Sequence, residues 1–272
     1  MTTPPGASPL GYSRQELMVI EAAHHVRDGD VVFVGTGLPL LATTLAQRAH
    51  APNVVCVIES GVIAPQVLPT PVSVSDPRVM HRAVRLGSLR DVLGCLLQRG
   101  RIDLGFIGGA QIDRYGNINS TQIGPPGAMR RRLPGSGGGN DMASHCRRLL
   151  VITRHERRRF PERCDYITSP GFLDGPGARR RAGLNPEFGV TVVTDLAVMA
   201  SDPATCTLRV TKLMPGITLD AVLAETEFRP AAAPDVCEVA PPTSADLRIL
   251  RDEVDPGRVY LKAEEPVSGS RR

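Results

Sequence analysis

The sequence predicts an α/β fold built around a mostly parallel sheet that is covered on both faces. Two observations carry this prediction: short, continuous apolar runs recur along the 272 residues, and the segments between them have amphipathic helical patterns. Parallel strands need long crossovers and bury both of their faces, so they are apolar throughout and alternate with helices. With 42% hydrophobic residues, the chain can bury a core that needs no disulfides.

The first elements follow this alternation. Ser-Arg-Gln-Glu is a capping-box pattern and predicts a helix from Ser13 to about Val26. A buried strand at 31–34 follows, and it ends in a Gly-Thr-Gly-Leu-Pro turn that lacks the third glycine of a dinucleotide fingerprint, so an NAD site is not expected. A helix at 40–48 and a strand at 54–58 complete this part of the pattern.

Later segments continue the alternation. Ser88 caps a predicted helix that ends near Gln98. The remaining predicted elements are strands at 103–107, 149–153 and 190–194, an edge strand at 207–210, a helix at 217–225 and a Pro- and Ala-rich loop at 231–243.

We expect one domain over residues 13–262, with flexible segments at 1–12 and 263–272. The first residues have neither a basic leader nor an apolar signal region, and no apolar run approaches membrane-spanning length. The expected location is therefore the cytoplasm, with no membrane partner.

Six cysteines are spread along the chain without a Cys-x-x-Cys pair. They are Cys56, Cys95, Cys146, Cys164, Cys206 and Cys237. Cys56, Cys95 and Cys206 are flanked by apolar residues, so the cysteines are predicted to be reduced core thiols, with neither a disulfide framework nor a zinc site. No metal is expected.

The net charge of +4 hides an Arg-rich segment. Residues 130–181 contain 13 Arg and no Lys against five acidic residues, so this segment carries +8 and the rest of the chain −4. Arg side chains match phosphate oxygens, so a phosphorylated ligand is one interpretation. Nucleic acid is disfavoured because stacking needs aromatic residues, which make up only 4% of the chain. A solvated Arg-rich face is the third interpretation.

Glu59 has the most informative position in the chain. It ends the apolar run at 54–58 and opens into a Ser-Gly turn. Ligands bind at the carboxyl ends of parallel strands, where a scaffold can hold a reactive carboxylate in one geometry. The alternative is an acidic residue in a surface turn, and these few residues leave both open.

Two glycine-containing segments lie further along. Residues 135–141 read Gly-Ser-Gly-Gly-Gly-Asn-Asp, and such a backbone can approach a ligand closely and turn its N–H groups toward negative charge. A disordered stretch is the alternative. Residues 113–119 centre on a Gly-Asn turn, whose asparagine side chains bond either the local backbone, which we favour, or a ligand.

Together these segments resemble the β subunit of the family I CoA-transferases, closest to the glutaconate CoA-transferase type. The resemblance covers most of the chain, from about Ser13 to Phe228. Six segments carry it, in this order: 35–39, 59–61, 108–113, 116–119, 135–141 and 212–217.

The resemblance implies a three-layer α/β/α fold and a heteromeric enzyme. In the family an α subunit contributes a Gly-Gly-Phe loop to the CoA site, and this sequence contains no Gly-Gly-Phe. The matching β-subunit carboxylate is the nucleophile, which corresponds to Glu59. The implied partners are an α subunit, an acyl-CoA and a carboxylic acid, with the CoA thioester as substrate and no permanently bound cofactor.

Further site residues follow from this chemistry. The tetrahedral intermediates need hydrogen-bond donors, for which the backbone of Gly137, Gly138 and Gly139 is the candidate, with Asn140 in the same oxyanion or CoA-binding set. The strand that precedes the Gly-Asn turn should end close to Glu59 in a parallel sheet. The candidates for lining the acyl site are Ser60, Gly61, Gln111, Asn117 and Asn119.

Three other functions stay open at this stage. A hydrolase of the same fold would use Glu59 as a general base toward water, in dicarboxylate or steroid-ring breakdown. A non-catalytic domain that binds CoA esters would not need Glu59. A sugar-phosphate isomerase of related architecture would work without a partner.

Overall fold

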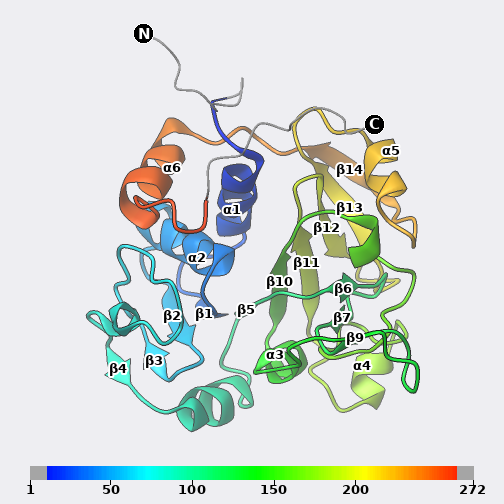
Figure 1. The fold of residues 1–272 in the computed structure, drawn as a ribbon, viewed down its shortest axis with the longest axis horizontal. Coiled ribbons are helices and arrows are strands. Elements are labelled where there is room, and N and C mark those ends of the chain that lie inside the picture. Colours follow the sequence, from blue (N-terminus) through cyan, green and yellow to red (C-terminus); the bar gives the residue numbers. More distant parts are fainter. Residues whose placement is uncertain (1–10, 262–272) are drawn as a thin grey trace.

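The computed structural model describes residues 11–261, which form one ten-stranded sheet with helices on both faces (Figure 1). The strand order is β14-β13-β12-β11-β10-β5-β1-β2-β3-β4, and it runs from β4 at the left of Figure 1 to β14 at the upper right. Residues 1–10 and 262–272 lie outside the described residues, and they include most of the predicted flexible segment 1–12 and all of the segment 263–272. The single domain over 13–262 stays a prediction.

Five parallel strands form the centre of the sheet. They are β2 Val55–Ile58, β1 Val31–Val34, β5 Leu104–Ile107, β10 Arg148–Ile152 and β11 Gly189–Val193. β1 pairs with β2 on one side and with β5 on the other, so the carboxyl ends of all three lie at one edge of the sheet. Each of these strands lies within one residue of the predicted bounds.

The outer strands and two small hairpins complete the β structure. Antiparallel pairing joins β12 Ala197–Ser201 to β11 and to β13 Leu208–Leu213, whereas β14 Ala232–Glu238 runs parallel to β13. At the other edge lie β3 Val62–Ile63 and β4 Arg85–Leu86. The hairpins are β6 Gln111–Ile112 with β7 Ile118–Asn119, and β8 Gln122–Ile123 with β9 Arg131–Arg132.

The helices connect the strands, and the first begins as predicted. Ser13 Oγ accepts from the Glu16 amide at 3.1 Å, and Glu16 Oε2 accepts from the Ser13 amide at 2.7 Å, which confirms the capping box. The α-helices are α1 Arg14–His24, α2 Leu38–Ala49, α3 Gly139–His145, α4 Ala178–Arg181, α5 Leu219–Ala224 and α6 Ser244–Arg248. The other helical segments are η1 Pro77–Met80, η2 Asp91–Leu97, η3 Arg157–Arg159 and η4 Ile249–Val254.

Two hydrophobic cores lie on opposite faces of the sheet. Successive residues of β1 alternate between them: Val32 and Val34 belong to the core under α1, α2 and η4, and Phe33 belongs to the core under α3, η2 and α5. Because side chains alternate across a strand, this division requires burial on both faces. It explains why the strands are continuously apolar, and it forms the three layers that the sequence predicts.

Buried ion pairs tie α1 to distant parts of the chain. Arg251 of η4 donates to Glu16 at 2.6 and 2.9 Å, and Lys212 of β13 donates to the buried Glu21 at 2.7 Å. Burial alone would raise the pKa of Glu21, but hydrogen bonds from neighbouring histidines and Lys212 hold it well below its ordinary value. Lys212 is thus engaged in the fold.

Two sequence-based expectations at the periphery are wrong. The strand at 207–210 is not an edge strand, because β13 pairs with β12 on one side and β14 on the other. The expected loop at 231–243 contains β14, which is the edge strand, and β12 was not predicted. The helix predicted from Ser88 to about Gln98 is present: Ser88 Oγ accepts from the Asp91 amide at 3.2 Å, and the π-helix η2 ends at Leu97.

Within residues 11–261, no helix is both long enough and apolar enough to span a membrane. The same residues contain no group of three or more His, Cys, Asp or Glu side chains placed to hold a metal ion.

Candidate active site

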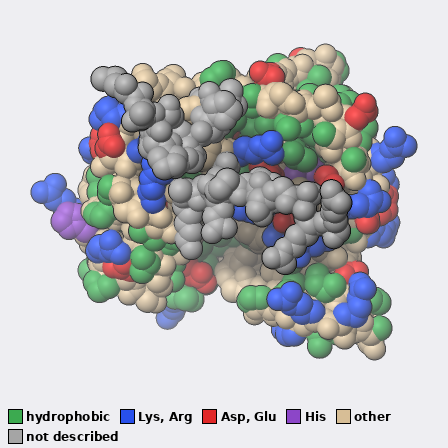
Figure 2. All heavy atoms as spheres, turned by 45° about the horizontal axis from the view of Figure 1, so that its top comes forward, with side chains coloured by type: hydrophobic (Ala, Val, Ile, Leu, Met, Phe, Trp, Pro, Cys, Tyr) green, Lys and Arg blue, Asp and Glu red, His purple; other side chains and the backbone are tan. Residues whose placement is uncertain are grey.

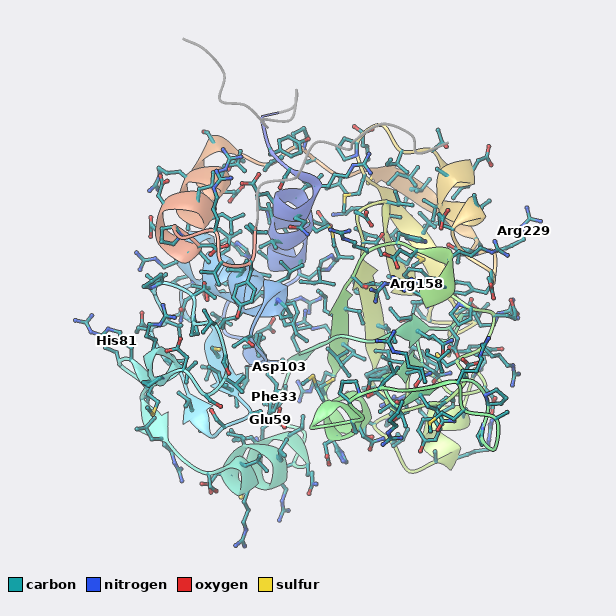
Figure 3. All side chains as sticks on the ribbon, viewed as in Figure 1. Phe33, Glu59, His81, Asp103, Arg158 and Arg229 are labelled. Atoms are coloured by element: carbon teal, nitrogen blue, oxygen red, sulfur yellow. The ribbon has the colours of Figure 1, made fainter. Side chains whose placement is uncertain are left out.

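Glu59 lies in the turn that directly follows β2, at the carboxyl edge of the parallel strands. The Gly61 amide closes this turn by donating to the Ile58 carbonyl at 2.9 Å. Figure 3 labels Glu59 at the turn between β2 and β3, on the side of α3. Its side chain is half-buried, and among the described residues its carboxylate makes no ion pair or hydrogen bond. The backbone of this turn therefore sets the position of the carboxylate, without help from a side-chain partner among the described residues.

The glycine-rich segment meets this carboxylate, although almost eighty residues separate them in sequence. A Cβ atom placed on Gly138 would lie 3.3 Å from Glu59 Oε1, and one placed on Gly137 would lie 4.0 Å from the same oxygen. The backbone can approach this closely because neither residue has a side chain. The structure thus brings together two segments that the sequence singled out separately.

The backbone amides of the glycine-rich segment differ in their availability. The Gly139 amide donates to the Ser136 carbonyl at 2.9 Å, and the Asn140 amide donates to Ser136 Oγ at 3.0 Å. Within the described residues the amides of Gly137 and Gly138 have no partner. Of the predicted donor set, only these two N–H groups remain for a ligand.

Asn140 and Gly139 instead hold the segment in place. Asn140 Nδ2 donates to the Thr168 carbonyl at 2.8 Å. A Cβ on Gly139 would lie 2.9 Å from Ile107 Cδ1 and 3.2 Å from Ser169 Oγ, so a larger residue would overlap the end of β5. Sequence alone did not single out Ile107 or Ser169, because both have side chains that read as ordinary core and loop residues.

Ser120 anchors the start of the same segment. The Gly135 amide donates to the Ser120 carbonyl at 2.8 Å, and Ser120 Oγ donates to the Gly135 carbonyl at 2.7 Å. This reciprocal pair attaches the glycine-rich segment to the loop between β7 and β8. The conformation next to Glu59 therefore depends on the hairpins that precede it.

Asn117 and Asn119 are structural residues in this arrangement. Asn117 is 1% exposed, and its Oδ1 accepts from the amides of Gly171 and Leu173, both at 2.9 Å. Asn119 is fully buried and donates from Nδ2 to Gln111 Oε1 at 2.7 Å. Asn119 Nδ2 also donates to the nearby Gln122 carbonyl at 2.6 Å, which is the local bonding favoured from the Gly-Asn turn. Asn117 instead bonds the backbone of a loop more than fifty residues away, and neither side chain offers a free polar atom to an acyl group.

Gln111 and Asp113 belong to the same polar network. Gln111 Nε2 donates to Asp165 Oδ2 at 3.0 Å. Asp113, which the sequence did not mark as a candidate, is buried and accepts from Asn117 Nδ2 at 3.0 Å. Burial raises the pKa of Asp113, and its hydrogen bonds from Asn117 and neighbouring amides only partly oppose that rise. The Asp-x-x-Gly-Asn pattern was the available signal for this turn.

Ser60 and Gly61 differ in their surroundings. Ser60 is exposed beside Glu59 and stays a candidate for contact with an acyl group. Gly61 is buried with φ +104°, and a Cβ there would lie 2.4 Å from the Gly87 carbonyl oxygen. Its role is to let the turn after Glu59 pack against the loop after β4.

The comparison with known protein families identifies the chain's relatives. The family described as coenzyme A transferase matches residues 16–225. The chain belongs to this family. It is 37% identical over 240 residues to the B-type subunit of 3-oxoadipate CoA-transferase from Pseudomonas knackmussii, covering 88% of this chain and 92% of that one. It is 36% identical over 256 residues to the B-type subunit of glutaconate CoA-transferase from Acidaminococcus fermentans, covering 92% and 96%.

Solved structures agree with this membership. The crystal structure of glutaconate coenzyme A-transferase from Acidaminococcus fermentans matches with a TM-score of 0.87 and 34% identity, over 94% of this chain and 99% of that one. Rhodococcus jostii IpdAB shares the fold at a TM-score of 0.75 and 23% identity, over 94% of this chain and 99% of that one. The predicted family and three-layer α/β fold class are both confirmed.

Proposed function

We propose that this chain is the β subunit of a heteromeric CoA-transferase in which Glu59 is the nucleophile. One observation carries the proposal: an unpaired, half-buried carboxylate lies against the two glycine residues whose amides are free among the described residues, in a member of the coenzyme A transferase family. Nucleophile and oxyanion donors side by side are what acyl transfer requires.

The reaction conserves the thioester bond. A Glu59 oxygen attacks the carbonyl carbon of the donor thioester, the C–S bond breaks, and CoA leaves as a thiolate from an acyl-glutamyl anhydride. The thiolate attacks the glutamyl carbonyl of that anhydride, and the donor carboxylate leaves with the C–O electron pair. The acceptor acid then attacks the resulting glutamyl-CoA thioester, and the same steps in reverse order give the acceptor acyl-CoA and free Glu59.

Each step passes through a tetrahedral oxyanion next to Glu59. The amides of Gly137 and Gly138 are the donors we assign to it, because they are unpartnered among the described residues and flank the carboxylate. Gly137 has φ +49°, a conformation that an L side chain rarely adopts, so glycine suits this position. Removing a single oxyanion donor typically slows such reactions by about 10²- to 10³-fold.

An α-type chain completes the site in this proposal. Both relatives above 35% identity are named as the B-type component of their enzymes, and the chain lacks the Gly-Gly-Phe loop that the resemblance assigns to the other subunit. The acids in the two names, 3-oxoadipate and glutaconate, are both dicarboxylates. CoA esters of dicarboxylic acids are therefore the first donors to assay, with free dicarboxylic acids as acceptors.

Trapping the covalent intermediate tests the proposal. The chain is co-expressed with an α-type chain, and the complex is incubated with a dicarboxylic acyl-CoA and then with borohydride or hydroxylamine. We expect the glutamyl thioester to be converted to an alcohol or a hydroxamate, and peptide mass spectrometry to place this change at Glu59. Turnover of the acyl-CoA with Glu59 unmodified under both reagents would contradict the assignment.

A hydrolase is the second candidate. The cholesterol ring-cleaving hydrolase IpdB subunit of Rhodococcus jostii is 28% identical over 156 residues, covering 55% of this chain and 58% of that one. In that case Glu59 would act as a general base toward water, and neither borohydride nor hydroxylamine would modify it. Adding an acceptor acid distinguishes the two, since a transferase forms a new CoA ester and a hydrolase releases free CoA at the same rate with or without acceptor.

Replacing Gly138 by Ala should crowd the reacting carboxylate. The new Cβ would lie 3.3 Å from Glu59 Oε1 and 3.4 Å from Leu93 Cδ2, while φ of −77° suits alanine. Since a small displacement of a catalytic group is costly, we expect the kcat for CoA exchange to fall by about tenfold or more with little change in thermal stability. The measurement is steady-state exchange with the purified complex.

Gly94→Ala is the matched control for this variant. Gly94 lies in η2, the same helix as Leu93, and a Cβ there would meet nothing within 4 Å. We expect exchange at the wild-type rate. Equal rates for both variants would show that the contact between Gly138 and Glu59 is not part of the reacting geometry.

A further inference from the structure

A groove lined by four arginines lies beside the hairpin that leads into the glycine-rich segment. Arg131 belongs to β9, and Arg130 directly precedes it. Arg158 and Arg159 belong to η3. The cavity has a volume of about 580 Å³, within the range of small-molecule sites. Figure 2 shows several Lys or Arg side chains on a projecting lobe at the lower right.

The groove carries a positive excess. Its lining has four arginines against the carboxylates of Asp165 and Glu227. Asp165 is held by neutral donors, Gln111 Nε2 at 3.0 Å and the Gly124 amide at 2.9 Å. Arg158 and Arg159 share the carboxylate of Glu156, at 2.6 and 3.3 Å. The excess therefore comes from the hairpin side of the groove.

Arg130 and Arg131 are available to a ligand. Both side chains are exposed, and among the described residues neither makes an ion pair or a side-chain hydrogen bond. Other arginines of the same segment are used by the fold: Arg148 pairs with Asp30, and the buried Arg179 donates to backbone carbonyls. The structure thus separates free guanidinium groups from structural ones.

An apolar wall accompanies the arginines. Ile123, Leu133 and Pro161 line the same groove. Guanidinium groups match phosphate oxygens bidentately, and apolar side chains accept the faces of a flat ring. The combination suits a nucleotide with several phosphate groups, and a free inorganic anion would not use the apolar wall.

The groove is within reach of Glu59 along the chain. Gly138 follows Arg131 by seven residues, so their Cα atoms lie no more than about 25 Å apart. The glycine-rich segment is also bonded to the loop between the two hairpins, since the Gly135 amide donates to the Ser120 carbonyl at 2.8 Å. The extended pantetheine arm of CoA covers a distance of this order between its thiol and its phosphates.

We infer that this groove binds the phosphorylated adenosine end of the CoA substrate, with Arg130 and Arg131 on its phosphate groups and Ile123, Leu133 and Pro161 against the base. This inference rests on the proposed function, since it places the far end of the same thioester whose carbonyl meets Glu59. Of the three interpretations of the Arg-rich segment, it selects the phosphorylated ligand.

Two measurements on the purified complex with its α-type chain test the inference. The first is calorimetric binding of adenosine 3′,5′-bisphosphate, which carries the base and two of the phosphate positions but no thioester. The second compares kcat/KM for an acyl-CoA with kcat/KM for the same acyl group on pantetheine. Both are made on wild type and on Arg131→Gln, and the double variant R130Q/R131Q serves as a stronger test.

We expect Arg131→Gln to weaken bisphosphate binding by about tenfold, in keeping with the loss of one charge-assisted contact. It should lower kcat/KM for the acyl-CoA by a similar factor and leave that for the acyl-pantetheine unchanged. Arg181→Gln is the matched control, because Arg181 is exposed in the same segment, has no ion pair among the described residues and lies outside this groove. It should behave as wild type.

Several results would overturn the inference. Unchanged bisphosphate affinity in R130Q/R131Q would overturn it. So would an equal loss of kcat/KM for the acyl-CoA and for the acyl-pantetheine. Dissociation of the complex in Arg131→Gln would assign these arginines to the partner contact, and tighter binding of a single-stranded oligonucleotide than of the bisphosphate would assign them to nucleic acid. If Glu59 is not labelled in the trapping experiment but the arginine variants still weaken bisphosphate binding, the nucleophile assignment is rejected and the assignment of the groove is kept.

Discussion

Glu59→Gln is expected to abolish CoA exchange while leaving the fold intact. The carboxamide has the shape of the carboxylate but cannot attack a thioester, and loss of a covalent nucleophile costs at least about 10⁴-fold in kcat. No ion pair or hydrogen bond of the described residues is lost, because the Glu59 carboxylate makes none. The expected melting temperature is therefore that of the wild type.

The measurement is acyl-CoA exchange by the co-purified complex, with thermal unfolding in parallel. Glu187→Gln is a matched control, since Glu187 is exposed and its carboxylate has no partner among the described residues. It should exchange CoA at the wild-type rate. A Glu59→Gln enzyme that keeps a tenth of the wild-type exchange would exclude covalent catalysis at this residue.

The central fold could be predicted because local signals and tertiary packing agree there. The parallel strands are buried on both faces, so continuous apolar runs such as the one before Glu59 mark them directly. The capping box at Ser13 is equally local, since both of its hydrogen bonds are made within one turn. These elements needed no knowledge of their neighbours.

The edge strand β14 could not be predicted, because its local sequence and its tertiary pairing disagree. β14 is largely exposed and contains Pro234, and it pairs with β13, whose partner residues lie more than twenty residues earlier in the chain. Proline is tolerated in an edge strand because one of its sides has no ladder to complete. The segment therefore has the composition of a loop and the structure of a strand.

At the candidate site, sequence predicted the chemical groups but could not assign their partners. Glu59 and the glycine-rich segment were both recognisable, yet only the folded chain shows that Gly138 faces the carboxylate and that the Gly139 amide is used by Ser136. Likewise, 13 arginines in one segment are indistinguishable by composition. Their division into structural and free groups depends on carbonyls and carboxylates distant in sequence.

Gly61→Ala should destabilise the chain strongly, by about 3 kcal/mol or more. Two effects combine at this position: φ of +104° disfavours any L residue, and the new Cβ would lie 2.4 Å from the Gly87 carbonyl oxygen and 2.9 Å from the Ser88 carbonyl carbon. These are backbone atoms, so relief requires moving either the turn that carries Glu59 or the loop after β4. Thermal unfolding should show a melting temperature lower by roughly 6 to 12 °C.

Gly29→Ala separates the two effects. Gly29 has φ +81°, but a Cβ there would meet nothing within 4 Å, so this variant reports the backbone cost alone, about 1 kcal/mol. The difference between the variants measures the overlap with Gly87. Equal melting temperatures for Gly61→Ala and Gly29→Ala would show that the loop after β4 moves aside at no measurable cost in stability. Because that loop packs against the turn that carries Glu59, a large difference would mean that backbone packing positions the Glu59 carboxylate, with no side-chain partner needed.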